Sequence, residues 1–293
     1  MATARTANFP SHGINVVSDL YLPSPTAPNR KNATVIVGHP GTGIKEQASS
    51  LYAKKLAEHG FTTLAFDAAH HGESGGEPCY LEDPYQRIED FKSAVTFLST
   101  LDSEVNPERI GTVGICASGG YVVSAAQTDL RLKAVATVCG VCLGAMTRDS
   151  MKNNSGAIDQ EILRQSLLFA GKDRIAEAKG SQPTAISTLQ VFEEAKEYYE
   201  TPRGQHPRCT NLQLVRSVDM LATYISFAFI GWISPRPLLM ITGSEADRGT
   251  GGPADTAHYT REAIEGRGHL ALYDKTAESV PKPAGFFAKS LCM

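Results

Sequence analysis

One cysteine in the stretch GICASGG, residues 114–120, has the surroundings of an attacking nucleophile. The preceding residues, RIGTVGIC, predict a buried strand, and the small residues that follow predict a helix. A strand that turns directly into a helix through the pattern G-x-nucleophile-x-G exposes the nucleophile above the sheet. We therefore interpret Cys116 as the candidate nucleophile, and the alternative is a small buried residue at a strand end. Ser118 stands where the pattern has its second glycine, but it fits less well as the nucleophile because position 116 would then have to be glycine.

A nucleophilic thiol needs a base, and His269 is the best candidate. It lies in EGRGHLALYD, in a glycine-flanked loop after a predicted helix and before the last predicted strand. A base there completes the chain order nucleophile, acid, base of a catalytic triad. His39 and His71 lie on loops after two other predicted strands, and with Gly41 they are expected to line a substrate site.

The acid that orients the histidine is expected in the segment RPLLMITGSEADRGTGG. Glu245 and Asp247 both follow the predicted strand directly, and either carboxylate could reach His269 from this loop. We prefer Asp247 because it lies deeper in the loop, and Glu245 stays open as the alternative. A solvated acidic turn is the plainer interpretation of the same residues.

An oxyanion hole requires two backbone N–H groups aimed at one point. Ala117 is expected to supply one, since it follows the nucleophile at the start of the predicted helix. The second donor is expected from the loop HPGTG, residues 39–43, whose glycines allow the backbone to approach a substrate closely. Thr42 is the preferred donor in this loop, with Gly41 as the alternative.

These residues need a sheet edge that brings them together, and the hydrophobic pattern predicts one. Short apolar runs at 33–38, 61–67, 109–116, 132–141, 236–243 and 270–274 predict strands, and amphipathic stretches between most of them predict helices, including one over 256–266. Such alternation indicates one α/β domain over residues 1–293, with a mostly parallel sheet and helices on both faces. A helical insertion over about 145–232, called the cap below, interrupts the alternation and is expected to lie over the carboxyl ends of the strands, where ligands bind.

Composition excludes several other functions. The net charge of −3 leaves no basic footprint for nucleic acid. The N-terminus has no secretory signal, and the apolar stretch over 220–233 is too short to span a bilayer, so a cytoplasmic location is expected. Six scattered cysteines indicate free thiols, and Cys139 and Cys142 are interpreted as buried thiols at a strand end rather than half of a zinc site. The sequence predicts no metal site and no cofactor.

The segments over 37–78, GTVGICASGGY, ISPRPLLMITGSEAD and GHLALYDK together resemble the α/β-hydrolase fold in its dienelactone-hydrolase-like branch. More narrowly they resemble the fungal polyketide transferase and thiohydrolase family, over nearly the whole chain except the cap. The resemblance implies a triad of Cys116, Asp247 and His269. It also implies transfer of an acyl chain from a thioester on a polyketide synthase carrier, releasing the product as an acid or by lactonisation (macrocyclisation).

The cap then bears on the choice between water and a hydroxyl as acceptor. Tyr224 and Phe227 belong to an apolar stretch that either packs on the core or lines an acyl tunnel, and a dry tunnel would favour cyclisation. The polar stretch over 194–210 is a lid, a carrier-docking surface or a solvated connection. Two rival functions remain: a small-molecule ester or lactone hydrolase of the dienelactone type, and a hydrolase-like binding protein without catalysis. A homodimer is left open.

Overall fold

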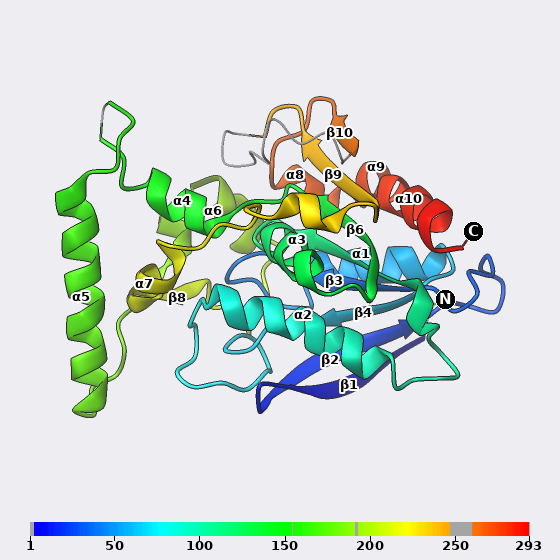
Figure 1. Cartoon of the computed structure of the whole chain (residues 1–293), viewed down its shortest axis with the longest axis horizontal. Coiled ribbons are helices and arrows are strands. Elements are labelled where there is room, and N and C mark those ends of the chain that lie inside the picture. The colour runs from blue at the N-terminus through cyan, green and yellow to red at the C-terminus, as the bar shows by residue number, and fades with distance from the viewer. Residues whose placement is uncertain (1–2, 154, 191–192, 247–259, 293) are drawn as a thin grey trace.

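The computed structural model describes residues 3–153, 155–190, 193–246 and 260–292 (Figure 1). Its centre is an eight-stranded sheet in the order β1-β2-β4-β3-β5-β6-β9-β10. The strands are β1 (Thr3–Ser11), β2 (Ile14–Leu22), β3 (Thr34–Gly38), β4 (Thr62–Phe66), β5 (Ile110–Ile115), β6 (Leu132–Val138), β9 (Leu238–Gly243) and β10 (Thr260–Ile264). β1 and β2 run antiparallel to their neighbours, and the strands from β4 to β10 are parallel. The chain passes from β3 outward to β4 and then returns across β3 to β5, which creates a ligand-binding switch point at the carboxyl ends of β3 and β5.

Helices cover both faces of the sheet because successive strand residues point to opposite faces. Val35 and Val37 pack with α1 (Ala48–Glu58) and α10 (Pro281–Cys292) in one core cluster. Ile36 packs with α2 (Pro84–Leu98) and α3 (Ser118–Thr128) in the other. β3, β4 and β5 are buried along their whole length, and this accounts for their continuous apolar sequences. The predicted α/β sheet with helices on both faces is confirmed.

The C-terminal elements differ from the prediction. Residues Thr260–Ile264, predicted as part of a helix, form β10, which pairs in parallel with β9. Residues Ala271–Asp274, predicted as the last strand, form the short helix α8, followed by α9 (Thr276–Ser279). β10 is an edge strand whose residues are mostly exposed, with two charged residues among five, so it lacks the apolar run that identifies a central strand. Leu272 and Tyr273 are both buried although they are neighbours, a pattern that one turn of helix and a buried strand share.

The cap contains more than helices. Its helices are α4 (Leu143–Asp149), α5 (Gln160–Ala178), α6 (Glu193–Tyr199) and α7 (Val218–Leu221), and α5 lies at the end of the molecule remote from the sheet (Figure 1). Two short strands, β7 (Ala185–Ser187) and β8 (Leu212–Leu214), pair antiparallel between them. Three-residue strands carry too few residues to show a periodicity, which is why the sequence did not predict this ribbon.

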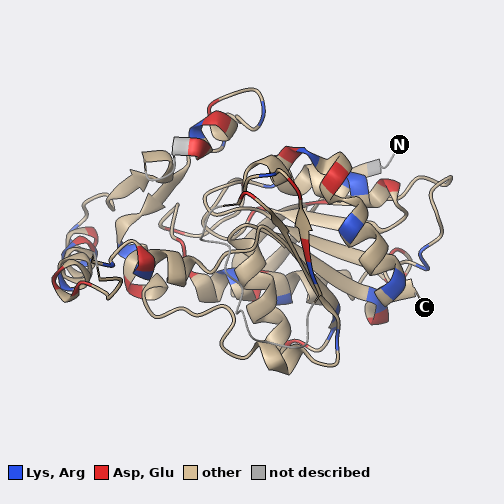
Figure 2. Cartoon of the chain, turned by 90° about the horizontal axis from the view of Figure 1, so that it is seen from above, with Lys and Arg blue, Asp and Glu red and all other residues tan. Residues whose placement is uncertain are grey.

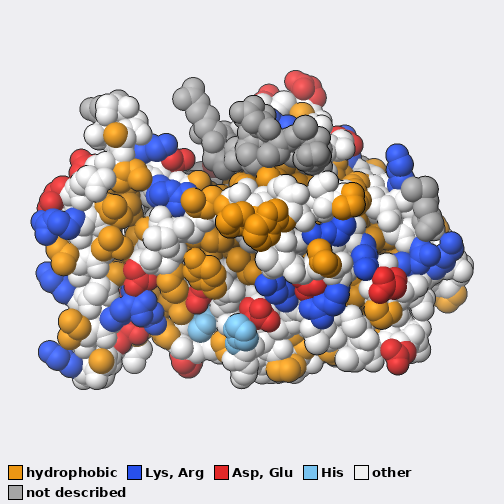
Figure 3. All heavy atoms as spheres, in the orientation of Figure 1, with side chains coloured by type: hydrophobic (Ala, Val, Ile, Leu, Met, Phe, Trp, Pro, Cys, Tyr) orange, Lys and Arg blue, Asp and Glu red, His pale blue; other side chains and the backbone are white. Residues whose placement is uncertain are grey.

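The surface agrees with the low net charge. Acidic and basic residues are interspersed along the helices (Figure 2). Hydrophobic side chains are exposed over the cap and beside it (Figure 3), among them Phe229 and Trp232, whose stacked rings have centroids 4.6 Å apart. Among the described residues, none of the helices combines the length and the apolar composition that a bilayer span requires. The prediction of buried thiols is confirmed for Cys139 and Cys142, which are 0% and 5% exposed.

Candidate active site

Cys116 occupies a sharp corner between β5 and α3. Its φ of +55° lies in the left-handed region that non-glycine residues rarely adopt, so the surrounding structure must hold it. The Cys116 N–H donates to the Val138 carbonyl (3.0 Å), and its carbonyl accepts from Gly119 N–H (2.8 Å) and Val141 N–H (3.0 Å). A Cβ on Gly114 would lie 2.1 Å from the Ser118 carbonyl oxygen, so this position requires glycine. The corner therefore has the geometry of a nucleophile elbow.

His269 lies against this corner, in the loop between β10 and α8. Burial alone raises the pKa of the Cys116 thiol, but the His269 charge and hydrogen bonds to the thiolate outweigh it, and the net pKa is lowered. Burial likewise lowers the pKa of His269, but the Cys116 thiolate and the Glu194 charge oppose burial, and the net pKa is raised. Each group thus favours the charged form of the other, which is the condition for a thiolate–imidazolium pair.

Tyr273 is a third member of this group that the sequence did not single out. Its hydroxyl lies 3.2 Å from His269 Nε2 and also interacts with the Cys116 thiolate. It comes from α8, four residues after His269, which is the spacing that puts two side chains on one side of a helical turn. The expectation of a strand over 270–274 concealed this spacing.

The predicted acid Asp247 lies outside the described residues. The alternative, Glu245, is exposed, and its N–H donates to the Arg267 carbonyl (3.0 Å) at the loop that leads to His269. A carboxylate that the sequence analysis missed, Glu194 on α6, lies with Oε1 3.4 Å from the position of a Cβ on Gly268. Its negative charge contributes to the raised pKa of His269, after the larger effects of burial and Cys116.

The loop over 39–43 lies beside the nucleophile corner. A Cβ on Gly41 would be 3.5 Å from the Ala117 Cβ, so the two predicted donor segments are in contact. Thr42 has a φ of +54°, and the Gly43 N–H is used within the turn by the Pro40 carbonyl (3.1 Å). Within the described part of the chain, the Thr42 N–H donates to no protein acceptor. Thr42 and Ala117 can therefore present N–H groups to one developing oxyanion.

His39 does not face this space. It is 0% exposed, its Nδ1 bonds the Pro40 carbonyl (2.7 Å), and its Nε2 accepts from Ala68 N–H (3.0 Å) and lies 3.1 Å from Arg87. Burial and the Arg87 charge hold the pKa of His39 well below its usual value, so the ring is neutral. These contacts hold the loop in place, and the contact of His39 with substrate stays a prediction.

The other predicted binding residues are also more buried than expected. His71 is 4% exposed, with Nε2 3.5 Å from the fully buried Glu82 carboxylate. Tyr224 is 4% exposed, and its hydroxyl lies 2.8 Å from Ser124 Oγ. Both side chains are buried in this structure, and their contact with substrate stays a prediction. Phe227 is half-buried against the core on the α3 side.

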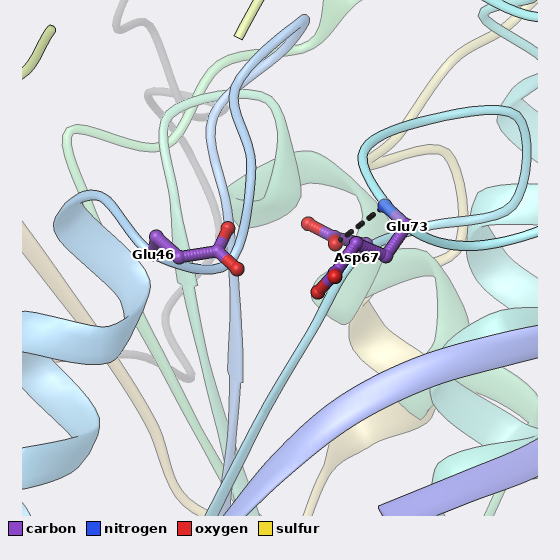
Figure 4. A group of neighbouring side chains, drawn as sticks. All are labelled: Glu46, Asp67 and Glu73. Carbon is purple, nitrogen blue, oxygen red and sulfur yellow. Dashed lines mark hydrogen bonds between the residues drawn. The ribbon is translucent and has the colours of Figure 1, made fainter. Parts of the chain in front are cut away.

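The carboxylates of Glu46, Asp67 and Glu73 lie close together (Figure 4). They are near the loop over 39–43, which is called the oxyanion loop below. Lys45 lies among them: its Nζ is 2.7 Å from Glu46 and 3.1 Å from Asp67, and it also bonds Glu73. The buried ammonium accounts for the close approach of these acids, and the cluster fixes the start of the segment that leads into α1.

Comparison with known proteins places the chain in a family. Residues 35–280 match the family described as "Alpha/beta hydrolase family". The chain is 35% identical to the uncharacterized protein YcjY of Escherichia coli (strain K12), over 97% of each chain. The crystal structure of hypothetical protein PA2218 from Pseudomonas aeruginosa superposes with a TM-score of 0.89, at 32% identity over 99% of this chain and 94% of that one. A fungal protein, thiohydrolase aneE of Aspergillus aculeatus, is 26% identical over 80% of this chain and 74% of that protein.

The chain therefore belongs to the alpha/beta hydrolase family. The predicted fold is confirmed at this level. Two of the three relatives are bacterial, and the fungal one is the most distant of the three in sequence.

Proposed function

We propose that this protein transfers an acyl group from a thioester to water or to a hydroxyl, through an acyl-enzyme on Cys116. The observation that carries the proposal is the pairing of Cys116 with His269. His269 lowers the pKa of the Cys116 thiol, and the Cys116 thiolate raises the pKa of His269. The name of the relative aneE, a thiohydrolase, favours a thioester donor. A polyketide acyl chain is the substrate class that the sequence resemblance implies.

In the first half-reaction the Cys116 thiolate attacks the thioester carbonyl carbon. The carbonyl electrons move to the oxygen, which receives hydrogen bonds from the Thr42 and Ala117 N–H groups. The tetrahedral intermediate then expels the donor thiolate, which takes a proton from the His269 imidazolium. One thioester is exchanged for another, so this step is close to thermoneutral.

In the second half-reaction His269, now neutral, removes a proton from the acceptor as the acceptor oxygen attacks the acyl-enzyme. Collapse of the second intermediate releases Cys116 as the thiolate and restores the imidazolium. Water yields an acid, an external alcohol yields an ester, and a hydroxyl of the same chain yields a lactone. Asp247 is proposed as the acid that orients His269.

The test compares donors. The protein is mixed with an N-acetylcysteamine thioester of a hydroxyacyl chain and, separately, with the ethyl ester of the same chain. We expect the thioester to turn over faster, and mass analysis identifies the product as acid, ester or lactone. Faster turnover of the simple ester would contradict the thioester proposal and favour a dienelactone-type ester hydrolase.

A further inference from the structure

Ser118, the residue that departs from the nucleophile pattern, joins the two halves of the proposed oxyanion hole. It is the first residue of α3 and is 1% exposed. Its Oγ donates to the His39 carbonyl oxygen at 2.5 Å and accepts from the Arg87 guanidinium at 3.2 Å. A glycine at this position, as in the usual pattern, could make neither bond.

The end of β3 is shaped to receive this side chain. A Cβ on Gly38 would lie 2.7 Å from Ser118 Oγ, 2.8 Å from Ser118 Cβ and 2.3 Å from the Phe91 ring. Gly38 is also the β3 partner of Gly114 in the β5 register. Two glycines on adjacent strands thus leave the space that Ser118 fills.

Arg87 supports the same carbonyl beside Ser118. Its Nη2 donates to the His39 carbonyl at 3.1 Å, so that oxygen receives two hydrogen bonds. The guanidinium is buried, and its charge is compensated by Glu82 at 3.5 Å and by the Tyr121 ring, whose centroid lies 5.1 Å away. Tyr121 in turn donates to Glu82 at 2.7 Å. A charged group this well surrounded holds a fixed position.

We propose that Ser118, supported by Arg87, is a positioning residue that sets the separation of the Thr42 and Ala117 N–H donors. Ser118 directly follows Ala117, and the carbonyl that it binds belongs to His39, three residues before Thr42. One short side chain thus connects the backbone segments that carry the two donors, and no substrate contact is required of it. This inference rests on the proposed acyl transfer and deepens it.

The test uses Ser118→Ala, with Ser124→Ala as the matched control. Ser124 lies on the same helix and also donates to a backbone carbonyl, that of Ser226 (3.0 Å), which belongs to neither donor segment. Two rates are measured for each protein: pre-steady-state acylation by the thioester, and alkylation of Cys116 by iodoacetamide. Acylation forms an oxyanion, whereas alkylation displaces iodide at a saturated carbon and forms none.

We expect Ser118→Ala to lower the acylation rate about 10- to 100-fold and to leave alkylation within about twofold of the unmodified protein. The loss is smaller than the ~100- to 1,000-fold loss from removal of a whole donor, because Arg87 still binds the carbonyl. Ser124→Ala should leave both rates within about twofold. Equal acylation in the two variants would overturn the inference, and so would a parallel loss of acylation and alkylation in Ser118→Ala, because the nucleophile itself would then be disturbed.

Failure of the proposed function has a different signature. It would appear as normal alkylation of Cys116 in the unmodified protein with no acylation by the thioester. Hydrogen–deuterium exchange over residues 39–43 then decides the positioning inference. Faster exchange in Ser118→Ala than in Ser124→Ala supports it, and unchanged exchange overturns it.

Discussion

At Cys116 two opposing effects meet on one sulfur atom. Burial disfavours the thiolate, and the positive His269 imidazole favours it, with the second effect the stronger once the hydrogen bonds to the thiolate are included. A thiol whose pKa is lowered has a larger thiolate fraction at a given pH than an ordinary cysteine, whose pKa is about 8.5. The same balance implies that the thiol depends on its histidine for reactivity.

The first prediction concerns the pH dependence of that reactivity. Because the pKa of Cys116 is lowered, alkylation by iodoacetamide should retain its plateau rate below the pH at which an ordinary thiol loses it. His269→Ala removes the charge that lowers the pKa of Cys116 and leaves the burial that raises it. The midpoint of the pH profile should therefore move to higher pH, and the alkylation rate at pH 7 should fall about tenfold or more. Superimposable pH profiles for the two proteins would show that His269 does not lower the pKa of the Cys116 thiol.

The second prediction concerns Tyr273. Tyr273→Phe removes a hydroxyl that interacts with the thiolate and with His269, so we expect the pKa of Cys116 to rise and alkylation at pH 7 to slow about two- to tenfold. The matched control is Tyr52→Phe, which removes a buried hydroxyl that donates at 2.5 Å to the Leu272 carbonyl. The control should lose about 1 kcal/mol of stability in urea unfolding and keep its alkylation profile. Equal alkylation rates in both variants would show that the Tyr273 hydroxyl does not stabilise the Cys116 thiolate.

At the scale of elements, the site is assembled from three segments that are distant in sequence. The β5–α3 corner supplies Cys116, the loop after β3 supplies Thr42, and the loop after β10 supplies His269. The cap also contacts the oxyanion loop, because Thr188 Oγ1 lies 3.0 Å from Thr42 Oγ1, and the Cys209 thiol donates to the Thr42 carbonyl at 3.5 Å. The cap therefore contributes to the backbone geometry at Thr42.

The third prediction tests this contact. Thr188→Val keeps the shape of the side chain and removes its bond to Thr42, so acylation should slow about two- to tenfold while alkylation of Cys116 is unchanged. The control is Thr184→Val in the same cap, since Thr184 bonds Asp173 rather than the oxyanion loop. If Thr184→Val slows acylation as much as Thr188→Val does, the effect reflects the stability of the cap and not the placement of Thr42.

Much of this assembly follows from local sequence. Buried apolar runs predicted β3 to β6 and β9, because a strand covered on both faces has to be apolar throughout. The pattern at 114–120 predicted the corner at Cys116, because sterics allow few residue types at so close a crossing. β10 and α8 were predicted incorrectly, since an exposed edge strand and a single turn of helix leave no distinctive period.

The contacts of Ser118, Arg87 and Tyr273 could not be predicted. Each depends on which remote backbone lies opposite the side chain. In the sequence, Ser118 is only a residue that differs from the glycine of the nucleophile pattern. Its hydrogen bond to the His39 carbonyl depends on the pairing of β3 with β5. Arg87 was one of several charged residues on an amphipathic helix until the fold buried it beside Glu82.

At the scale of the whole molecule, the fold carries a buried charge network directly behind the site. Glu82 and Arg87 are 0% and 3% exposed, and they connect α2 to the oxyanion loop through His39. Burial alone raises the pKa of Glu82, but Arg87, His71 and the Tyr121 hydroxyl lower it to about 2. An unpaired charge in such a place is costly, so the network contributes to the folding stability of the entire chain.

The fourth prediction is a pH dependence of that stability. A carboxyl group whose pKa is depressed by folding stabilises the folded state above its unfolded pKa, about 4.5, and this contribution is lost as the pH falls toward 2. The shift corresponds to about 3 kcal/mol in the free energy of unfolding. Glu82→Gln should lower stability in urea at pH 7 and flatten the dependence between pH 4.5 and 2. The exposed Glu161→Gln is the control, and an equal acid dependence in both variants would contradict the assignment.

The central claim is that Cys116 forms the acyl-enzyme, and intact-protein mass spectrometry tests it most directly. The protein is quenched in acid milliseconds after mixing with the hydroxyacyl thioester, and the acylated residue is located by peptide mapping. We predict one acyl group on Cys116, its absence in Cys116→Ala, and full labelling in Cys79→Ala, which removes the exposed thiol. Turnover and labelling in Cys116→Ala at the level of the unmodified protein would contradict the account.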